Sequence, residues 1–247
     1  MRHYLTALQF LTILPLPSKP VFEKEALGRS TAWFPLAGLT LGALLLLADY
    51  GLSFLFPRHL TDALLVMLLA LVTGALHLDG LADVCDGLAA RGDRERFLAV
   101  MKDSRVGAVG VVGLMAGLGL KYAALLAVPE QAKWQALLLF PALARFVMTL
   151  VMTGAANARS DGLGAAFLAG IGKWQLLFAA LTVLPLCWLT ADLQGIAALL
   201  LASLWGLSVR SYFTRKLGGI TGDIVGFSGE TAEILCLLCL AALSGIA

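Results

Sequence analysis

The sequence predicts an all-α protein that crosses a membrane about seven times and folds as one domain over residues 1–247. Three observations support this fold class. The 247-residue chain is 60% hydrophobic and only 14% charged. Its mean hydropathy is +0.88, whereas about a quarter of the residues in a soluble domain are charged. The apolar residues also gather in long runs, which polar and glycine-rich segments separate.

The elements follow from these runs. Residues 3–14, before Pro15, form an amphipathic stretch that is too short to span a bilayer. It predicts an interfacial or re-entrant helix. Transmembrane helices are expected at about residues 33–56, 61–78, 106–128, 133–152, 174–189, 196–212 and 232–247. Gly38 and Gly42 form a small-x-x-x-small pair in the first run, which predicts close helix packing.

The basic residues predict the orientation of these helices. Four loops share one side of the membrane if the expected spans are right: residues 17–31, 80–105, 154–173 and 210–231. These loops hold thirteen of the eighteen lysines and arginines, and the opposite loops hold only Arg58 and Lys133. Because lysine and arginine concentrate in cytoplasmic loops, the first set is expected to face the cytoplasm. The net charge of +2 gives no indication of a nucleic-acid partner.

The segment HLDGLADVCDG at residues 77–87 is the first candidate site. Asp79, Asp83 and Asp86 lie within eight residues, and on a helix their spacing puts all three carboxylates on one face. Like charges this close repel unless a cation lies among them. Hard oxygen ligands suit Mg²⁺, which usually binds together with substrate phosphates. A solvated acidic loop is the alternative.

The segment MKDSRVGAVG at residues 101–110 follows on the same side. Lys102 and Arg105 are candidate phosphate ligands, because arginine binds phosphate oxygens bidentately. Asp103 either adds a metal ligand or orients Arg105. Alternatively, Ser104 and Asp103 cap the third span.

A glycine-rich segment at residues 217–233 is the third candidate site. Its backbone suits an anion, and Gly222 and Asp223 are the residues we expect to bind substrate there. Asp223 and Glu230 are candidates to complete a metal shell. Alternatively, Glu230 and Glu233 favour the start of a helix through its dipole.

Arg145 and Lys121 are cations in apolar surroundings. A buried cation needs a partner, so each is expected to neutralise an acid or to bind an anionic substrate. Arg145 lies deeper in its run, and we assign it a binding role. Lys121 can instead extend to the membrane interface.

Five segments together resemble the cobalamin synthase family, the adenosylcobinamide-GDP ribazoletransferases. They are QFLTILPLP at residues 9–17, WFPLAG at 33–38, HLDGLADVCDG at 77–87, MKDSRVG at 101–107 and TGD at 221–223. The third and fourth segments together are highly specific for the family, the first is less so, and the resemblance covers nearly the whole chain.

The resemblance implies an inner-membrane enzyme of cobalamin (vitamin B12) biosynthesis. Such an enzyme joins adenosylcobinamide-GDP to α-ribazole or its 5′-phosphate and releases GMP, and the resemblance implies Mg²⁺ as the cofactor. In that mechanism Asp79, Asp83 and Asp86 hold the metal, and Asp86 or Asp103 takes the proton of the attacking hydroxyl. The substrates, membrane lipid and a second copy of the chain are the expected partners.

Two alternatives come from other features. Residues 83–91 fit the first half of the D-x-x-D-G-x-x-A-R signature of CDP-alcohol phosphotransferases, but the second half of that signature is absent. Glycine-rich spans and intramembrane cations also occur in secondary transporters. Against a transporter, the charges gather at one face of the membrane and no internal repeat is visible.

Overall fold

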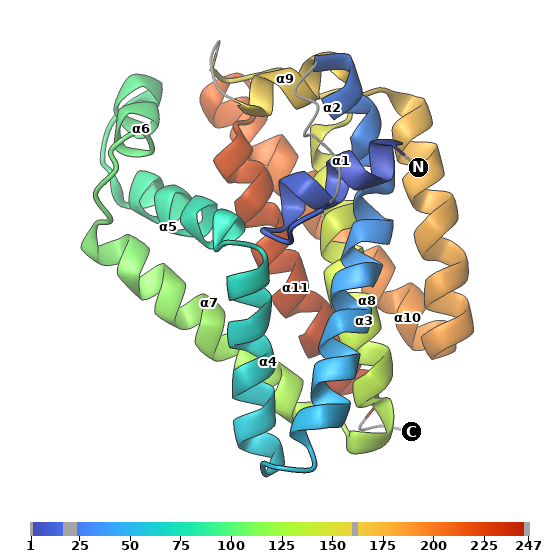
Figure 1. Cartoon of the computed structure of the whole chain (residues 1–247). Helices are drawn as coiled ribbons and strands as arrows, with labels where there is room; N and C mark the ends of the chain where they lie inside the picture. The colour runs from blue at the N-terminus through green and yellow to red at the C-terminus, as the bar shows by residue number, and fades with distance from the viewer. Residues whose placement is uncertain (1, 17–23, 160–162, 245–247) are drawn as a thin grey trace.

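The computed structural model describes residues 2–16, 24–159 and 163–244, and this part of the chain is almost entirely helical (Figure 1). Its helices are α1 (Arg2–Leu11), α2 (Lys24–Ser30), the 3-10 helix η1 (Thr31–Trp33), α3 (Phe34–Leu52), α4 (Arg58–Val72), α5 (Leu76–Ala89), α6 (Arg94–Val100), α7 (Ala108–Ala127), α8 (Glu130–Met152), α9 (Leu163–Gly170), α10 (Lys173–Leu217) and α11 (Gly222–Ser244). The all-α membrane fold is therefore confirmed.

The number of spans agrees closely with the sequence. Among the described residues, five helical stretches are long and apolar enough to cross a membrane, or six if α4 and α5 count as one bent span. One of the five, α10, is two helices joined at Ala191 and Asp192, whose backbones are not helical. A Cβ on Gly195 would lie 2.4 Å from the carbonyl oxygen of Cys187, so the chain folds back tightly there. The two arms of α10 correspond to the expected fifth and sixth spans.

The centre of the bundle is α8, which packs against α3, α10 and α11. Its contact with α3 depends on the two glycines that the sequence singled out. A Cβ on Gly38 would lie 2.4 Å from the carbonyl oxygen of Pro141, and one on Gly42 would lie 2.6 Å from that of Leu137. Backbones this close leave no room for larger residues, so the predicted close packing is confirmed.

The prediction of one straight second span at residues 61–78 is wrong. The helix ends at Val72, and α5 leaves at an angle of 91° to α4. Gly74 and Ala75 have φ angles of 60° and 54°, in the left-handed region that ends helices. The backbone N–H of Ile13 donates to the carbonyl of Val72, which anchors the break to the end of α1. Because of this bend, α5 runs across the long direction of the bundle (Figure 1), and its 14 residues are too few to cross a membrane on their own.

The last helix begins ten residues earlier than the sequence predicted. α11 starts at Gly222, not at residue 232, so half of the expected glycine-rich loop is helical. The Thr221 hydroxyl accepts a hydrogen bond from the Ile224 N–H at 3.3 Å and caps this start. Glycine then allows close packing, since a Cβ on Gly226 would lie 3.3 Å from the Cα of His77. This earlier start brings Asp223 onto the first turn of a helix.

The helices α1, α2, α5, α6 and α9 all lie at one end of the bundle, and the turn between α3 and α4 lies at the other (Figure 1). The polar loops expected on one side of the membrane connect these end helices. Most of the basic side chains and all three candidate segments therefore gather at the same end.

Candidate active site

The three aspartates of α5 do not share one environment. Asp79 is exposed and lines a cavity, whereas Asp83 is half-buried. The Asp86 carboxylate turns toward α7 and accepts hydrogen bonds from the backbone N–H groups of Gly107 and Gly110, both at 2.7 Å. Asp86 thus caps α7, a role that the sequence assigned to Ser104 and Asp103. The metal-binding role of all three carboxylates stays a prediction, although Asp86 already has two backbone partners.

Glycines on α7 make this contact possible. A Cβ on Gly110 would lie 2.4 Å from Asp86 Oδ2, and one on Gly113 would lie 2.5 Å from Cys85 Sγ. A Cβ on Gly117 would approach Leu81 to 2.7 Å. The glycines of α7 therefore make this helix a packing surface for α5.

Asp83 lies in a cluster of like charges. Burial, together with the carboxylates of Asp79, Asp223 and Asp86, raises its pKa to about 7, against the opposing effect of Arg159. A divalent cation relieves such repulsion. Among the described residues no three His, Cys, Asp or Glu side chains converge closely enough to hold a metal alone. Mg²⁺ needs only one or two carboxylates when substrate phosphates and water complete its shell, so Asp79 and Asp83 fit this ion.

Asp223 faces α5 from the first turn of α11. A Cβ on Gly80 would lie 2.6 Å from the carbonyl oxygen of Asp223, so the two helices touch at this point. The Asp223 carboxylate accepts a hydrogen bond from Arg159 Nη1 at 2.9 Å and one from the Thr221 hydroxyl at 3.3 Å. Gly222 and Asp223 both line the cavity, as the sequence predicted for substrate-binding residues.

Arg159 is a site residue that sequence analysis missed. A single parallel bridge, in which Ala158 N–H donates to Ile220 and Ile220 N–H donates to Ala156, pairs its loop with the segment before α11. This pairing brings Arg159 beside Asp223, 64 positions later in the chain. The only signal in the sequence was a basic residue in a glycine-rich loop on the site side.

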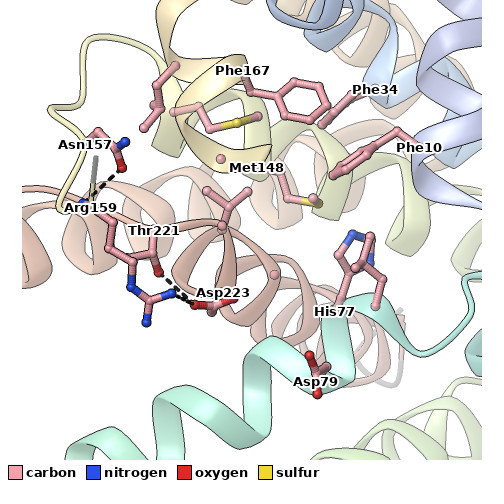
Figure 2. A pocket seen from close by; sticks show the side chains of 17 residues that line it. Phe10, Phe34, His77, Asp79, Met148, Asn157, Arg159, Phe167, Thr221 and Asp223 are labelled. Carbon is pink, nitrogen blue, oxygen red and sulfur yellow. Dashed lines mark hydrogen bonds and ion pairs between the residues drawn. The ribbon is translucent and has the colours of Figure 1, made fainter. Parts of the chain in front are cut away.

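The cavity itself measures about 250 Å³ and has two unlike ends (Figure 2). Asp79, Arg159, Thr221 and Asp223 lie at the polar end. The other end is formed by aromatic and aliphatic side chains, namely Phe10, Phe34, Met148, Met152, Phe167 and Leu168. A molecule that is apolar at one end and polar at the other would fit this shape.

Two shallower hollows extend the site along α6. Lys102 and Arg94 line a hollow that shares Asn157 and Arg159 with the cavity. The structure thus brings Lys102 close to the other candidate residues, although 57 positions separate it from Arg159 in the chain. Its ammonium group extends the positive charge of Arg159 along this side of the site.

Asp103 and Arg105 lie in the other hollow, together with Asp86. Arg105 donates to both carboxylate oxygens of Asp103, at 3.0 and 2.7 Å. These hydrogen bonds lower the pKa of the exposed Asp103 to about 2. A carboxylate with so low a pKa accepts protons poorly near neutral pH. Asp103 therefore orients Arg105, the second role that the sequence left open for it.

Arg145 does not reach the cavity. It is 1% exposed and pairs with Glu233 inside the bundle. Lys121, 3% exposed, donates to Glu230 at 2.7 Å and also pairs with Glu233. These four side chains, from α7, α8 and α11, form a buried network of two cations and two anions. The binding role that we assigned to Arg145 is not supported, because Arg145 pairs with Glu233. Glu230, a candidate metal ligand, pairs with Lys121 in this structure.

Comparison with known proteins identifies the relatives of this chain. A model of the family described as cobalamin-5-phosphate synthase matches residues 3–241. The chain belongs to the cobalamin-5-phosphate synthase family. No solved structure matches it.

Curated members of the cobalamin-5-phosphate synthase family match over nearly the full chain. An adenosylcobinamide-GDP ribazoletransferase of Geotalea daltonii is 56% identical over 245 residues, which cover 99% of both chains. Proteins with the same name from Roseiflexus and Pseudomonas fluorescens are 37% and 41% identical, over 95% of this chain and 87% and 97% of their own. The family predicted from the five segments is therefore confirmed, and the transporter and CDP-alcohol alternatives lose their support.

Four of the five segments that predicted the cobalamin-5-phosphate synthase family converge on the cavity. Residues 9–17 provide Phe10, and residues 33–38 provide Phe34. Residues 77–87 provide His77 and Asp79, and residues 221–223 all line the cavity. Parts of the chain more than two hundred residues apart thus build one site.

Proposed function

We propose that this protein transfers the adenosylcobinamide-phosphate group of adenosylcobinamide-GDP to α-ribazole or its 5′-phosphate and releases GMP. The products are adenosylcobalamin or its 5′-phosphate. The observation that supports this function best is the juxtaposition of Asp79, Asp223 and Arg159 at the polar end of the cavity, with Asp83 near enough to feel their charges. The names of the relatives give the substrates.

Each residue has a proposed part in the transfer. Asp79 and Asp83 hold Mg²⁺, which when bound neutralises charge on the diphosphate. Arg159 and Lys102 bind phosphate oxygens, and Arg105, held by Asp103, binds a further part of the donor. A ribose hydroxyl oxygen of the acceptor attacks the phosphorus attached to the cobinamide arm, and the bond from that phosphorus to the oxygen of GMP breaks. Asp223 is the proposed acceptor of the hydroxyl proton, because it lines the polar end of the cavity.

The purified protein should release GMP from adenosylcobinamide-GDP only when both α-ribazole and Mg²⁺ are present. Chelation with EDTA should stop GMP release, and added Mg²⁺ should restore it, because the diphosphate charge is then neutralised again. Chromatography of the nucleotide products measures this directly. Ca²⁺, which is larger and prefers more ligands, serves as the comparison. Full activity in EDTA would rule out the metal, and the absence of GMP under all conditions would rule out the reaction.

We propose further that the cavity opens toward the cytoplasm, in the inner membrane. The basic residues in the loops that connect α5, α6, α7, α9 and α11 support this orientation. Since α11 begins at the cavity and ends at the opposite end of the bundle, a reporter fused after Ser244 should lie outside the cytoplasm (Figure 1). Alkaline phosphatase should be active there, and green fluorescent protein should stay dark. The opposite pattern would place the site on the outer face.

A further inference from the structure

The aromatic end of the cavity takes no part in the proposed phosphate chemistry. Phe10, Phe34 and Phe167 come from α1, α3 and α9, and Figure 2 shows their side chains close together on one side of the cavity. The ring centroids of Phe10 and Phe167 are 4.4 Å apart, and those of Phe34 and Phe167 are 5.8 Å apart. Met148, from α8, lines the same cavity. Four separate helices thus build a surface suited to a flat, apolar group.

The volume of the cavity excludes most of the donor. At about 250 Å³, it is smaller than the roughly 300–1,000 Å³ that drug-sized ligands occupy. A corrinoid macrocycle is much larger than this and has to remain outside. The cavity can enclose only a heterocyclic base or a group of similar size.

The chemistry of the lining distinguishes the two bases in the reaction. The edges of guanine present several hydrogen-bond donors and acceptors, which would lose water without gaining partners among Phe10, Phe34, Phe167 and Met148. The base of α-ribazole is a dimethylbenzimidazole, whose far edge consists of two methyl groups. Its apolar edge suits the aromatic end, and its ribose hydroxyls suit the polar end.

We propose that the aromatic end of this cavity binds the base of α-ribazole, and that the ribose then points toward Asp79 and Asp223. This inference rests on the proposed function and names the substrate group that the cavity holds. Phe167 is 3% exposed, and its ring contacts both Phe10 and Phe34, whose own ring centroids are 6.1 Å apart. We therefore choose Phe167 as the position to test. Bound in this way, a ribose hydroxyl lies on the carboxylate side of the cavity while the corrinoid stays outside.

Binding of radiolabelled α-ribazole to the detergent-solubilised protein tests this inference without donor or Mg²⁺. Phe167→Ala should weaken binding by about 10-fold to 100-fold, in line with base stacking on an aromatic side chain. The Michaelis constant for adenosylcobinamide-GDP should stay unchanged. Phe140→Ala is the matched control, since Phe140 is 1% exposed and belongs to a different apolar cluster. It should bind α-ribazole like the wild type.

A second measurement applies if Phe167→Ala does not fold. Phe10→Leu changes a half-buried ring at the same end and retains most of its apolar volume. In the wild type, removing the two methyl groups from the base should weaken binding, and in Phe10→Leu this loss should be smaller. Equal losses in both proteins, or unchanged α-ribazole binding in Phe167→Ala, would overturn the inference.

The result separates this inference from the proposed function. If the function is wrong, the wild-type protein binds no α-ribazole and releases no GMP. If only the subsite is wrong, the wild type binds and turns over α-ribazole normally, and Phe167→Ala matches Phe140→Ala. A weaker affinity for adenosylcobinamide-GDP alone in Phe167→Ala would assign the aromatic end to the donor.

Discussion

The substitution Asp83→Asn should lower the rate of GMP release by about 10²–10³-fold, and the variant should remain folded. The substitution keeps the shape of the side chain and removes the charge that would hold a cation against the diphosphate. Asp83 lies among Asp79, Asp86 and Asp223, and burial with their negative charge raises its pKa to about 7. Ionised Asp83 therefore opposes folding, and Asn should leave stability unchanged or higher. Loss of turnover without loss of stability is expected of a residue kept for function.

Two comparison variants give this experiment its control. Asp192→Asn changes an exposed carboxylate at the bend of α10, where φ is 44° and Asn is tolerated. It should retain full activity. Asp86→Asn, unlike Asp83→Asn, should destabilise the protein, because Asp86 caps α7. The expected loss in the free energy of unfolding is about 1–2 kcal/mol. Wild-type turnover in Asp83→Asn would remove this residue from the proposed metal site.

Glu233→Gln should destabilise the protein by about 3–5 kcal/mol, the cost of removing one partner from a buried ion pair. Glu233 is fully buried and pairs with both Lys121 and Arg145. After the substitution, Glu230 still neutralises Lys121. Arg145 has no second carboxylate partner among the described residues and would remain a buried, uncompensated charge. Unfolding by denaturant in detergent measures the loss.

A second variant, which keeps the charges of the network balanced, should restore the stability that Glu233→Gln loses. The double variant Arg145→Met with Glu233→Met removes one cation and one anion and leaves the Lys121–Glu230 pair intact. It should recover most of the stability, because a neutral apolar pair replaces a neutral ionic one. Glu95→Gln, in an exposed pair with Arg94 at 3.9 Å, should have almost no effect. If Glu233→Gln costs less than about 1 kcal/mol, the buried network does not hold α7, α8 and α11 together.

Local patterns determined much of this protein from the sequence alone. Continuous apolar runs predict membrane helices because a backbone in lipid must satisfy its own hydrogen bonds. The positions of α3, α7, α8 and both arms of α10 followed from this rule. The acidic segment at residues 77–87 and Asp223 were found in the same way, since charges next to apolar runs are costly and therefore informative. The five quoted segments were enough to predict the family.

Contacts between distant parts of the chain decided the rest. The bend between α4 and α5 lies at the left-handed backbones of Gly74 and Ala75, and a hydrogen bond from Ile13 to Val72 ties it to α1. A run of apolar residues does not reveal that contact. Asp86 caps α7 and Arg145 pairs with Glu233 because helix packing brings them together. Arg159 meets Asp223 in the same way. Sequence periodicity specifies which face of a helix is apolar, but only the packed bundle specifies which other helix that face contacts. The cavity lies between helices, so it exists only once they have packed.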